Sequence, residues 1–230
     1  MPEADSTEET SLLSRPPTFA RTGMVVASHP AAAAAGRDAL LAGGSAVDAL
    51  VAAGAVLAVV EPGASGLGGD AFFLVHEPGR DVIAVNGSGA APATLTRDRF
   101  GGASTVPVRG TLSATTPGCV AAWSEATQRF GRLAWADLFA AAIRESEGFP
   151  VSMQLARGLR VQRALLQSDP GLGALFLRDG EPLSSGSVCR PRALGGSLRA
   201  IASEGAAALY GGGVGRALCC LLYTSPSPRD

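Results

Sequence analysis

The chain of 230 residues is long enough for one large domain or two small ones. It is 47% apolar and 17% charged, as expected of a globular protein with a large core, and only 5% aromatic, so small aliphatic side chains must build that core. A formal net charge of −1 favours neither a nucleic-acid partner nor an anionic membrane partner, and four cysteines without C-x-x-C spacing predict no disulfide framework. We expect no metal and no cofactor.

The two ends of the chain differ from the rest. Residues 1–20 are polar, acidic and without periodicity, which predicts a flexible leader. They lack the basic and apolar segments of a secretory signal, so the expected location is the cytoplasm. Residues 219–230 show no helical or strand pattern and are interpreted as a non-native tail, with a disordered native terminus as the alternative. The folded part is expected over residues 21–218, where the longest apolar run is too short to span a bilayer.

The first folded elements are predicted from small-residue patterns and end signals. Met24–Ser28 has a β-like pattern. Residues 31–41 have high helix propensity, with a proline in the first turn and a glycine pair as the C-terminal stop. Ser45 and Asp48 have the spacing of a capping box, which predicts that a second helix over residues 46–59 begins there.

A hairpin is predicted after the Gly-rich loop Gly63–Gly69. The runs Ala71–Glu77 and Asp81–Asn86 are strand-like, and the Pro-Gly pair between them is a hairpin signal. Because apolar residues occupy consecutive positions in both runs, we expect helical layers on both faces of this sheet. The remainder is mainly helical, with helices predicted over residues 119–130, 135–147, 152–166 and 191–203.

The Gly-rich loop is the first candidate for a ligand site. In a dinucleotide-binding motif the loop runs from a strand into a helix, whose N-terminus meets the pyrophosphate. Here a helix precedes the loop and a strand follows it, and no Gly-Lys-Ser/Thr motif is present. A tight turn that brings helix and sheet together is therefore a better interpretation than a nucleotide-binding α/β protein.

Four polar residues near this loop are expected to be structural. His29 begins a helix and His76 lies in an apolar strand, positions where a lone histidine is more often structural than catalytic. Asp48 is favoured by the positive end of its helix dipole, and Asp70 is expected to hydrogen-bond to the loop. No serine has the G-x-S-x-G context of a nucleophile elbow.

Several segments, taken in order and at their spacing, resemble the gamma-glutamyltransferase family, whose members are N-terminal-nucleophile hydrolases. The resemblance covers roughly residues 22–218 and rests mainly on Gly23–Pro30, Gly43–Ala49, Val60–Pro62, Ser65–Gly69, Thr116–Gly118, Phe130–Gly131, Trp135–Phe139 and Gly148–Val151. It implies an α+β fold, a four-layer αββα sandwich, of which this chain contains only a part.

The resemblance also implies where the chemistry lies. In this family a precursor cleaves itself and leaves a catalytic threonine at the N-terminus of the small subunit, where its own amine acts as the base. No threonine here, including Thr115 and Thr116, has the family's Thr-x-His-x-Ser context. We therefore expect no catalytic residue in this chain, a nucleophile beyond Asp230, and the missing C-terminal half of the precursor as a partner.

One departure from the family pattern concerns the substrate. Typical transferases continue the second strand of the hairpin into Arg-Glu-x-Ala-Pro, and that arginine pairs with the α-carboxylate of the γ-glutamyl donor. This chain has Asn-Gly-Ser-Gly-Ala-Ala-Pro, with Ser88 at the arginine position. Ser88, Gly87 and Gly89 are the predicted substrate-binding residues, and the variant resembles the acylase or amidohydrolase branch.

The predicted function is hydrolysis or transfer of γ-glutamyl or related acyl groups from small-molecule amides such as glutathione. The chain would be the N-terminal part of that enzyme and inactive by itself. A non-catalytic structural or binding domain of the same fold is the alternative, and a nucleotide-binding α/β protein is the third hypothesis.

Overall fold

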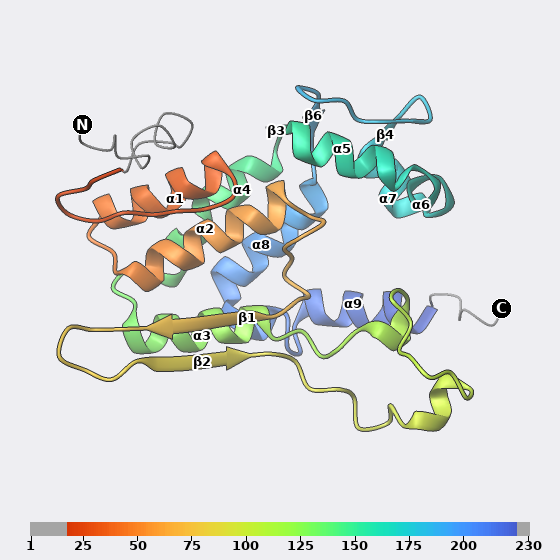
Figure 1. Cartoon of the computed structure of the whole chain (residues 1–230), viewed down its shortest axis with the longest axis horizontal. Helices are drawn as coiled ribbons and strands as arrows, with labels where there is room; N and C mark the ends of the chain where they lie inside the picture. Colours follow the sequence, from red (N-terminus) through yellow and green to blue (C-terminus); the bar gives the residue numbers. More distant parts are fainter. Residues whose placement is uncertain (1–17, 225–230) are drawn as a thin grey trace, which may run out of the picture.

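The computed structural model describes residues 18–224, which form an α+β fold (Figure 1). Its helices are α1 Pro30–Leu41, α2 Ala46–Val60, α3 Cys119–Phe130, α4 Ala140–Ser146, α5 Met153–Val161, α6 Arg163–Ser168, α7 Pro170–Phe176, α8 Arg192–Glu204 and α9 Gly213–Thr224. Its strands are β1 Ala71–Val75, β2 Ile83–Gly87, β3 Phe149–Pro150, β4 Leu177–Arg178, β5 Glu181–Pro182 and β6 Val188–Cys189. They pair as three antiparallel two-stranded sheets, β1–β2, β3–β6 and β4–β5.

Helices α1 and α2 begin where the sequence predicts. The Nδ1 atom of His29 accepts a hydrogen bond from the Ala31 N–H at 3.2 Å and caps α1, which confirms a structural role for this histidine. Ser45 and Asp48 form the predicted capping box. Asp48 does more than favour the helix dipole, because its Oδ2 also accepts from the Arg132 N–H at 2.8 Å and so ties α2 to the loop after α3.

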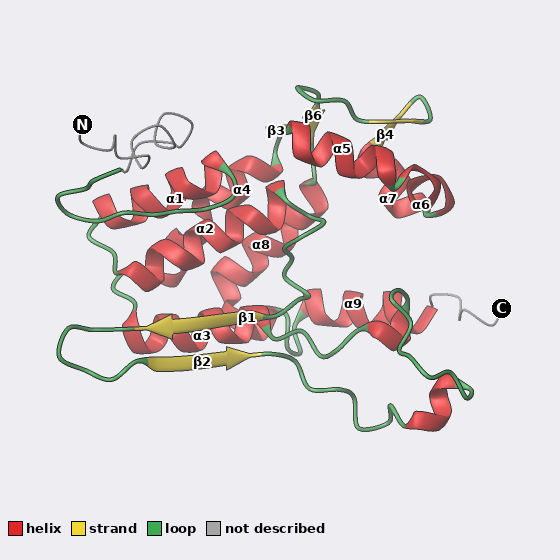
Figure 2. Cartoon of the chain, in the orientation of Figure 1, coloured by secondary structure: helices red, strands yellow, loops and turns green. Residues whose placement is uncertain are grey.

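Helix α2 lies at the centre of the core. Eleven of its 15 residues are buried, and α1, α3 and α4 pack around it (Figure 2). Small residues allow this close approach: a Cβ at Gly36 would lie 3.0 Å from the Ala49 carbonyl oxygen, and a Cβ at Gly54 would lie 3.2 Å from the Trp123 ring. The abundance of alanine and glycine thus serves helix packing around a single buried helix.

Strands β1 and β2 form the predicted hairpin. The register pairs Phe73 with Val85, and both side chains are buried on the face that α3 covers. On the opposite face Phe72 is 66% and Leu74 78% exposed. The prediction that both faces are covered is therefore wrong for residues 18–224, which supply a helix to one face while alternate side chains point to the other. The sandwich is present in part, as an α layer and one hairpin of a β layer.

The N-terminal β-like segment differs from its prediction. Met24–Ser28 forms no strand, because no segment within the described range pairs with it. Local pattern alone cannot supply a pairing partner, and an unpaired β-like segment stays irregular.

The C-terminal half is helical as predicted but more finely divided. The helix predicted over 135–147 starts as a 3-10 helix, Trp135–Phe139, and the one over 152–166 breaks at Gln162 into α5 and α6. Helix α7 and the two-residue strands occupy stretches for which no element was predicted, since elements so short show no measurable period.

Helix α9 corrects the secondary structure expected for the C-terminal residues; whether they are native stays a prediction. It continues to Thr224, so the predicted lack of helix from Cys219 onward is wrong as far as that residue. A short apolar run does not reveal its secondary structure by periodicity. Residues 225–230 of the predicted tail and residues 1–17 of the predicted leader lie outside the described range. No single helix within 18–224 is long and apolar enough to cross a membrane. Within this range only the bent helix pair Arg192–Ala208 and Gly213–Leu222, taken together, has the length and apolar composition of a membrane span.

Candidate functional site

Three chain segments meet at the predicted substrate-binding residues: the loop before β1, the end of β2 and the start of α3 (Figure 1). The backbone N–H groups of Gly118 and Cys119 both donate to the Gly69 carbonyl, at 2.9 and 2.8 Å. Farther along, the Thr116 N–H donates to the Ala90 carbonyl at 3.1 Å. The start of α3 and the residues just before it are thus bonded through backbone atoms to the loop before β1 and to the segment after β2.

Glycines are required where these segments touch. A Cβ at Gly118 would overlap the Gly87 carbonyl oxygen, and a Cβ at Gly89 would overlap the Thr116 carbonyl oxygen. A Cβ at Gly87 would lie 2.7 Å from the Ala71 carbonyl oxygen, closer than Cβ atoms approach in proteins. Gly87 and Gly89, predicted as substrate-binding residues, therefore have a structural reason for their identity: backbone meets backbone with no room for a side chain.

Asp70 and Asn86 fix the backbone on either side of Ser88. Asp70 Oδ1 accepts a hydrogen bond from the Gly89 N–H at 2.9 Å, so this carboxylate bonds structurally, but to the segment after β2 rather than to the Gly-rich loop as predicted. Asn86 Oδ1 accepts from the Ser88 N–H, also at 2.9 Å. The Ser88 residue itself is exposed, so its hydroxyl is presented to solvent from a backbone held on both sides. The amides of Ser88 and Gly89 are already used within the protein.

Tyr210 completes the start of α3, and sequence reasoning gave it no site role. Its hydroxyl donates to the Pro117 carbonyl at 2.8 Å and accepts from the Ala121 N–H at 3.0 Å. Burial raises the pKa of Tyr210, although the bond from Ala121 opposes this shift. No local signal could have found the contact, because 89 residues separate the two partners.

Cys119 has the side chain at this site that could most readily act as a nucleophile, but its environment suppresses the reactivity of the thiol. Burial, with a smaller contribution from the negative charge of Asp70, raises the pKa of the thiol to about 12. At neutral pH the side chain is therefore a thiol rather than the reactive thiolate. It borders a cavity of about 320 Å³ that also touches Asp70, Phe72 and Trp123.

Several backbone N–H groups of the Gly-rich loop are bonded within the loop or to the end of α2. The Ala64 and Ser65 N–H groups donate to the Glu61 carbonyl at 2.9 and 3.0 Å, and the Gly69 N–H donates to the Gly66 carbonyl at 3.2 Å. These bonds confirm the tight turn that the sequence predicts. The first N–H groups of α3 are likewise directed at Gly69 and Tyr210, as described above, so they offer no anion site.

The other predicted polar residues lie away from this cluster. His29 and Asp48 cap helices, and His76 is exposed where the chain leaves β1. Among residues 18–224 no group of three or more histidine, cysteine, aspartate or glutamate side chains could hold a metal ion. The site thus consists of a hydrogen-bonded strand end that carries the exposed Ser88, and of a small cavity that Asp70 lines and Ser88 does not.

Solved structures define the class to which this fold belongs. The gamma-glutamyltranspeptidase of Helicobacter pylori matches with a TM-score of 0.82 and 28% identity, over 88% of this chain and 60% of that chain. The cephalosporin acylase of Bacillus halodurans matches with a TM-score of 0.77 and 33% identity, over 90% of this chain and 41% of that chain. The chain therefore has, in part, the α+β fold of the N-terminal-nucleophile hydrolases.

Within that class the chain belongs to the gamma-glutamyltranspeptidase family, whose family model matches residues 32–222. It is 39% identical over 207 residues to a glutathione hydrolase-like proenzyme of Bacillus subtilis and 40% identical over 197 residues to an oxamate amidohydrolase proenzyme of Klebsiella pneumoniae. These alignments cover 89% and 83% of this chain but only 39% and 37% of the relatives' lengths. An acylase proenzyme of a Pseudomonas strain is similar at 40% identity over 217 residues.

Proposed function

We propose that the protein to which these residues belong hydrolyses or transfers acyl groups of small-molecule amides. The observation that carries this proposal is the family match over residues 32–222, together with relatives named as glutathione hydrolase-like, acylase and amidohydrolase proenzymes. The chain spans less than two fifths of the length of these relatives. The activity is therefore proposed for the whole protein rather than for this portion.

The described portion supplies a substrate-side scaffold rather than the reacting group. At the candidate site the Cys119 thiol is held protonated by burial, and the glycine amides bond within the protein. The catalytic threonine of such an enzyme, with its own N-terminal amine as base, is proposed to lie in sequence beyond Asp230. This assignment leaves Ser88 to contact substrate without taking part in bond making.

The exposed hairpin face supports a second, C-terminal part as the partner of this one. Phe72 and Leu74 present large apolar side chains to solvent at 66% and 78% exposure, on a sheet whose opposite face is packed. Covering such a face removes apolar surface from water and is favourable by roughly 25 cal/mol per Å². We propose that the second β layer of the sandwich, contributed by the other part of the protein, packs on this face.

Ser88 is proposed to set the substrate preference. A serine hydroxyl cannot form the two parallel, charge-assisted bonds that an arginine forms with a carboxylate. A substrate recognised here therefore gains less from an α-carboxylate than it would with an arginine at this position, because the hydroxyl donates only one hydrogen bond. This favours acyl amides of the acylase or amidohydrolase type over γ-glutamyl donors.

The test uses the full coding sequence. We expect the expressed protein to cleave itself into two subunits, and a Thr→Ala variant at the new N-terminus to abolish both cleavage and activity. Two anilides are compared as substrates, one γ-glutamyl and one acyl group of equal length without the α-amino and α-carboxylate groups. An intact, inactive protein would reject the enzyme hypothesis in favour of a non-catalytic domain.

Ser88→Arg tests the role of this position separately. A charged hydrogen bond contributes roughly 1.5–3 kcal/mol, so we expect the ratio of kcat/KM for the γ-glutamyl over the plain acyl substrate to rise at least about tenfold. Ser104→Arg, at an exposed loop position, is the matched control and should leave the ratio unchanged. An unchanged ratio in Ser88→Arg would remove Ser88 from the substrate site.

A further inference from the structure

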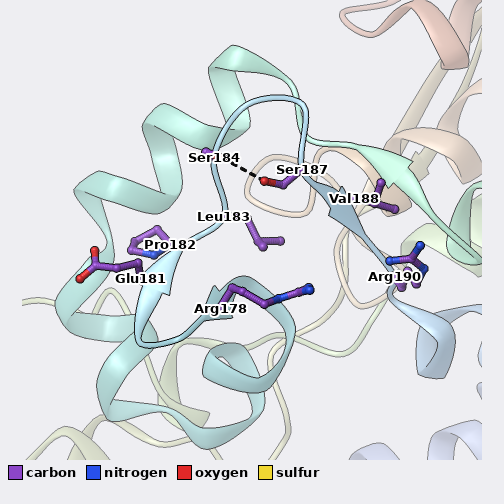
Figure 3. Close-up of a pocket in the computed structure, with 8 residues that line it drawn as sticks. All are labelled: Arg178, Glu181, Pro182, Leu183, Ser184, Ser187, Val188 and Arg190. Atoms are coloured by element: carbon purple, nitrogen blue, oxygen red, sulfur yellow. Dashed lines mark hydrogen bonds between the residues drawn. The ribbon is translucent and has the colours of Figure 1, made fainter.

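A second cavity lies in the C-terminal half, away from the β1–β2 hairpin (Figures 1 and 3). It measures about 520 Å³ and is formed by the small hairpin β4–β5, the loop that joins β5 to β6, and the β6 segment as far as Arg190. Its lining residues are Arg178, Glu181, Pro182, Leu183, Ser184, Ser187, Val188 and Arg190. None of them belongs to the site described above.

The lining carries two arginines whose charge is not neutralised. The one lining acid, Glu181, forms an ion pair with Arg163 outside the cavity. Figure 3 shows the Glu181 carboxylate on the far side of Pro182, directed away from both lining arginines. Among residues 18–224 no ion pair involves Arg178 or Arg190.

Both arginines line the same cavity. In Figure 3 the side chain of Arg178 extends toward Arg190 across the cavity. Its charge reaches the neighbouring Cys189, where it lowers the pKa of a thiol that burial raises. The Arg190 side chain lies next to Gly148, where a Cβ would be at an ordinary contact distance of 3.5 Å from its Cγ. Like charges directed at one space repel each other, and an anion between them converts that repulsion into attraction.

The rest of the lining suits a small ligand. The hydroxyls of Ser184 and Ser187 lie 3.0 Å apart and bond to each other, which leaves one O–H donor for a ligand. The loop that carries them is fixed by backbone bonds from the Gly186 N–H to the Val151 carbonyl and from the Ser187 N–H to the Ser184 carbonyl. Leu183 is buried beneath and gives the cavity an apolar floor.

We propose that this cavity is a binding site for a small oxyanion, a carboxylate or phosphate group bound between Arg178 and Arg190. Guanidinium groups bind both kinds of oxyanion through paired N–H donors, and the Ser184–Ser187 pair supplies a further donor. The apolar floor accommodates a short carbon chain attached to the anion. The site is independent of the amide chemistry proposed for the β1–β2 region, and it stands if that proposal fails.

The test is calorimetric titration of the full-length protein with sodium phosphate and with sodium succinate, each against sodium chloride at equal ionic strength. Saturable binding of either anion over chloride is expected, and the anion that binds more tightly identifies the head group. Arg178→Ala and Arg190→Ala should each weaken binding at least tenfold. Arg178→Lys keeps the positive charge but loses the paired N–H donors of the guanidinium group. This variant should still bind the anion, but more weakly than the parent protein.

Arg160→Ala is the matched control, because Arg160 is an exposed arginine outside the cavity and its loss changes net charge equally. It should leave the affinity within about twofold, and far-UV circular dichroism with a thermal melt checks that every variant is folded. Absence of saturable binding to both anions, or equal loss in Arg160→Ala and Arg178→Ala, would overturn the proposal.

Discussion

The helical region around α2 and the β1–β2 hairpin are built from the same kinds of residues but differ in how far their cores are complete. In the helical region, Val51, Leu198 and Ile201 are fully buried, and even a carboxylate, Asp48, is enclosed with its hydrogen-bond partners. In the hairpin Phe73 is 6% exposed while its neighbour Phe72 is 66% exposed. One region is closed by its own helices, and the other is closed on one face only.

This difference shows which part of the family fold buries its core with residues of the described range alone. The helices obtain their stability from contacts among residues 30–204, whereas the hairpin depends on α3 for one face and on nothing in the described range for the other. The candidate site lies in the incomplete region, at the end of β2. The proposed substrate site and the proposed contact with the C-terminal part of the protein therefore lie in the same region of the chain.

The largest effect should separate the two faces of the hairpin. Phe73→Ala is expected to lower the free energy of unfolding of the 230-residue chain by about 4 kcal/mol, because it removes a buried ring and leaves a cavity. Phe72→Ala should change it by less than about 0.5 kcal/mol, since its ring is already in water. Chemical denaturation followed by circular dichroism measures both. In the full-length protein, a large loss for Phe72→Ala would show that the face is covered there.

Gly118→Ala should also be severe, at about 3 kcal/mol or more. The added methyl group would overlap the Gly87 carbonyl oxygen, and backbone on both sides cannot move aside as a side chain would. Gly66→Ala is the matched control, because nothing lies within 4 Å of its added Cβ. Equal melting temperatures for the two variants would contradict the close backbone contact between β2 and α3.

Asp48→Ala tests the closed region, with an expected loss of roughly 2–3 kcal/mol. The substitution leaves the N–H groups of Ser45 and Arg132 without their charged acceptor in a buried place. Asp38→Ala, which removes an exposed carboxylate from α1, should stay within about 0.5 kcal/mol. The two variants are compared by urea denaturation, and a small loss for Asp48→Ala would mean that the helical region tolerates an incomplete α2 start.

The smallest expected effect is that of Tyr210→Phe, about 1–2 kcal/mol. Only the hydroxyl is lost, and with it the bonds to the Pro117 carbonyl and the Ala121 N–H. Amide hydrogen exchange should show faster exchange at Ala121 than in the parent protein. Unchanged exchange there would indicate that water replaces the hydroxyl without cost.

The features that the sequence predicts correctly are those with local causes. The capping box of Ser45 and Asp48 lies within four residues, and the hairpin needs only two strand-like runs and a Pro-Gly turn between them. Family resemblance located Gly87, Ser88 and Gly89, while the structure shows why two of them are glycines. Their role toward substrate stays a prediction.

The features that sequence reasoning missed depend on distant partners. Tyr210 reaches the start of α3 across 89 residues, and Asp48 reaches Arg132 across 84, separations at which no pattern in one sequence marks a pair. The same limit applies to the β-like pattern of Met24–Ser28, which is real but finds no partner strand in the described range. The sequence predicts that both faces of the hairpin are covered, and this is wrong for the described residues because apolar side chains are also found on exposed surfaces.

The bond from Ala121 to Tyr210 has a consequence for the order in which the molecule is made. A ribosome delivers β1, β2 and α3 well before it delivers residue 210, and N-terminal segments begin to fold first. Until Tyr210 emerges, the first turn of α3 lacks the hydroxyl that pairs with the Ala121 N–H. The start of α3, against which Gly87 and Gly89 pack, therefore gains its last hydrogen bonds only after residue 210 has been made, whereas Asp70 and Asn86 can hold the strand end at Ser88 earlier.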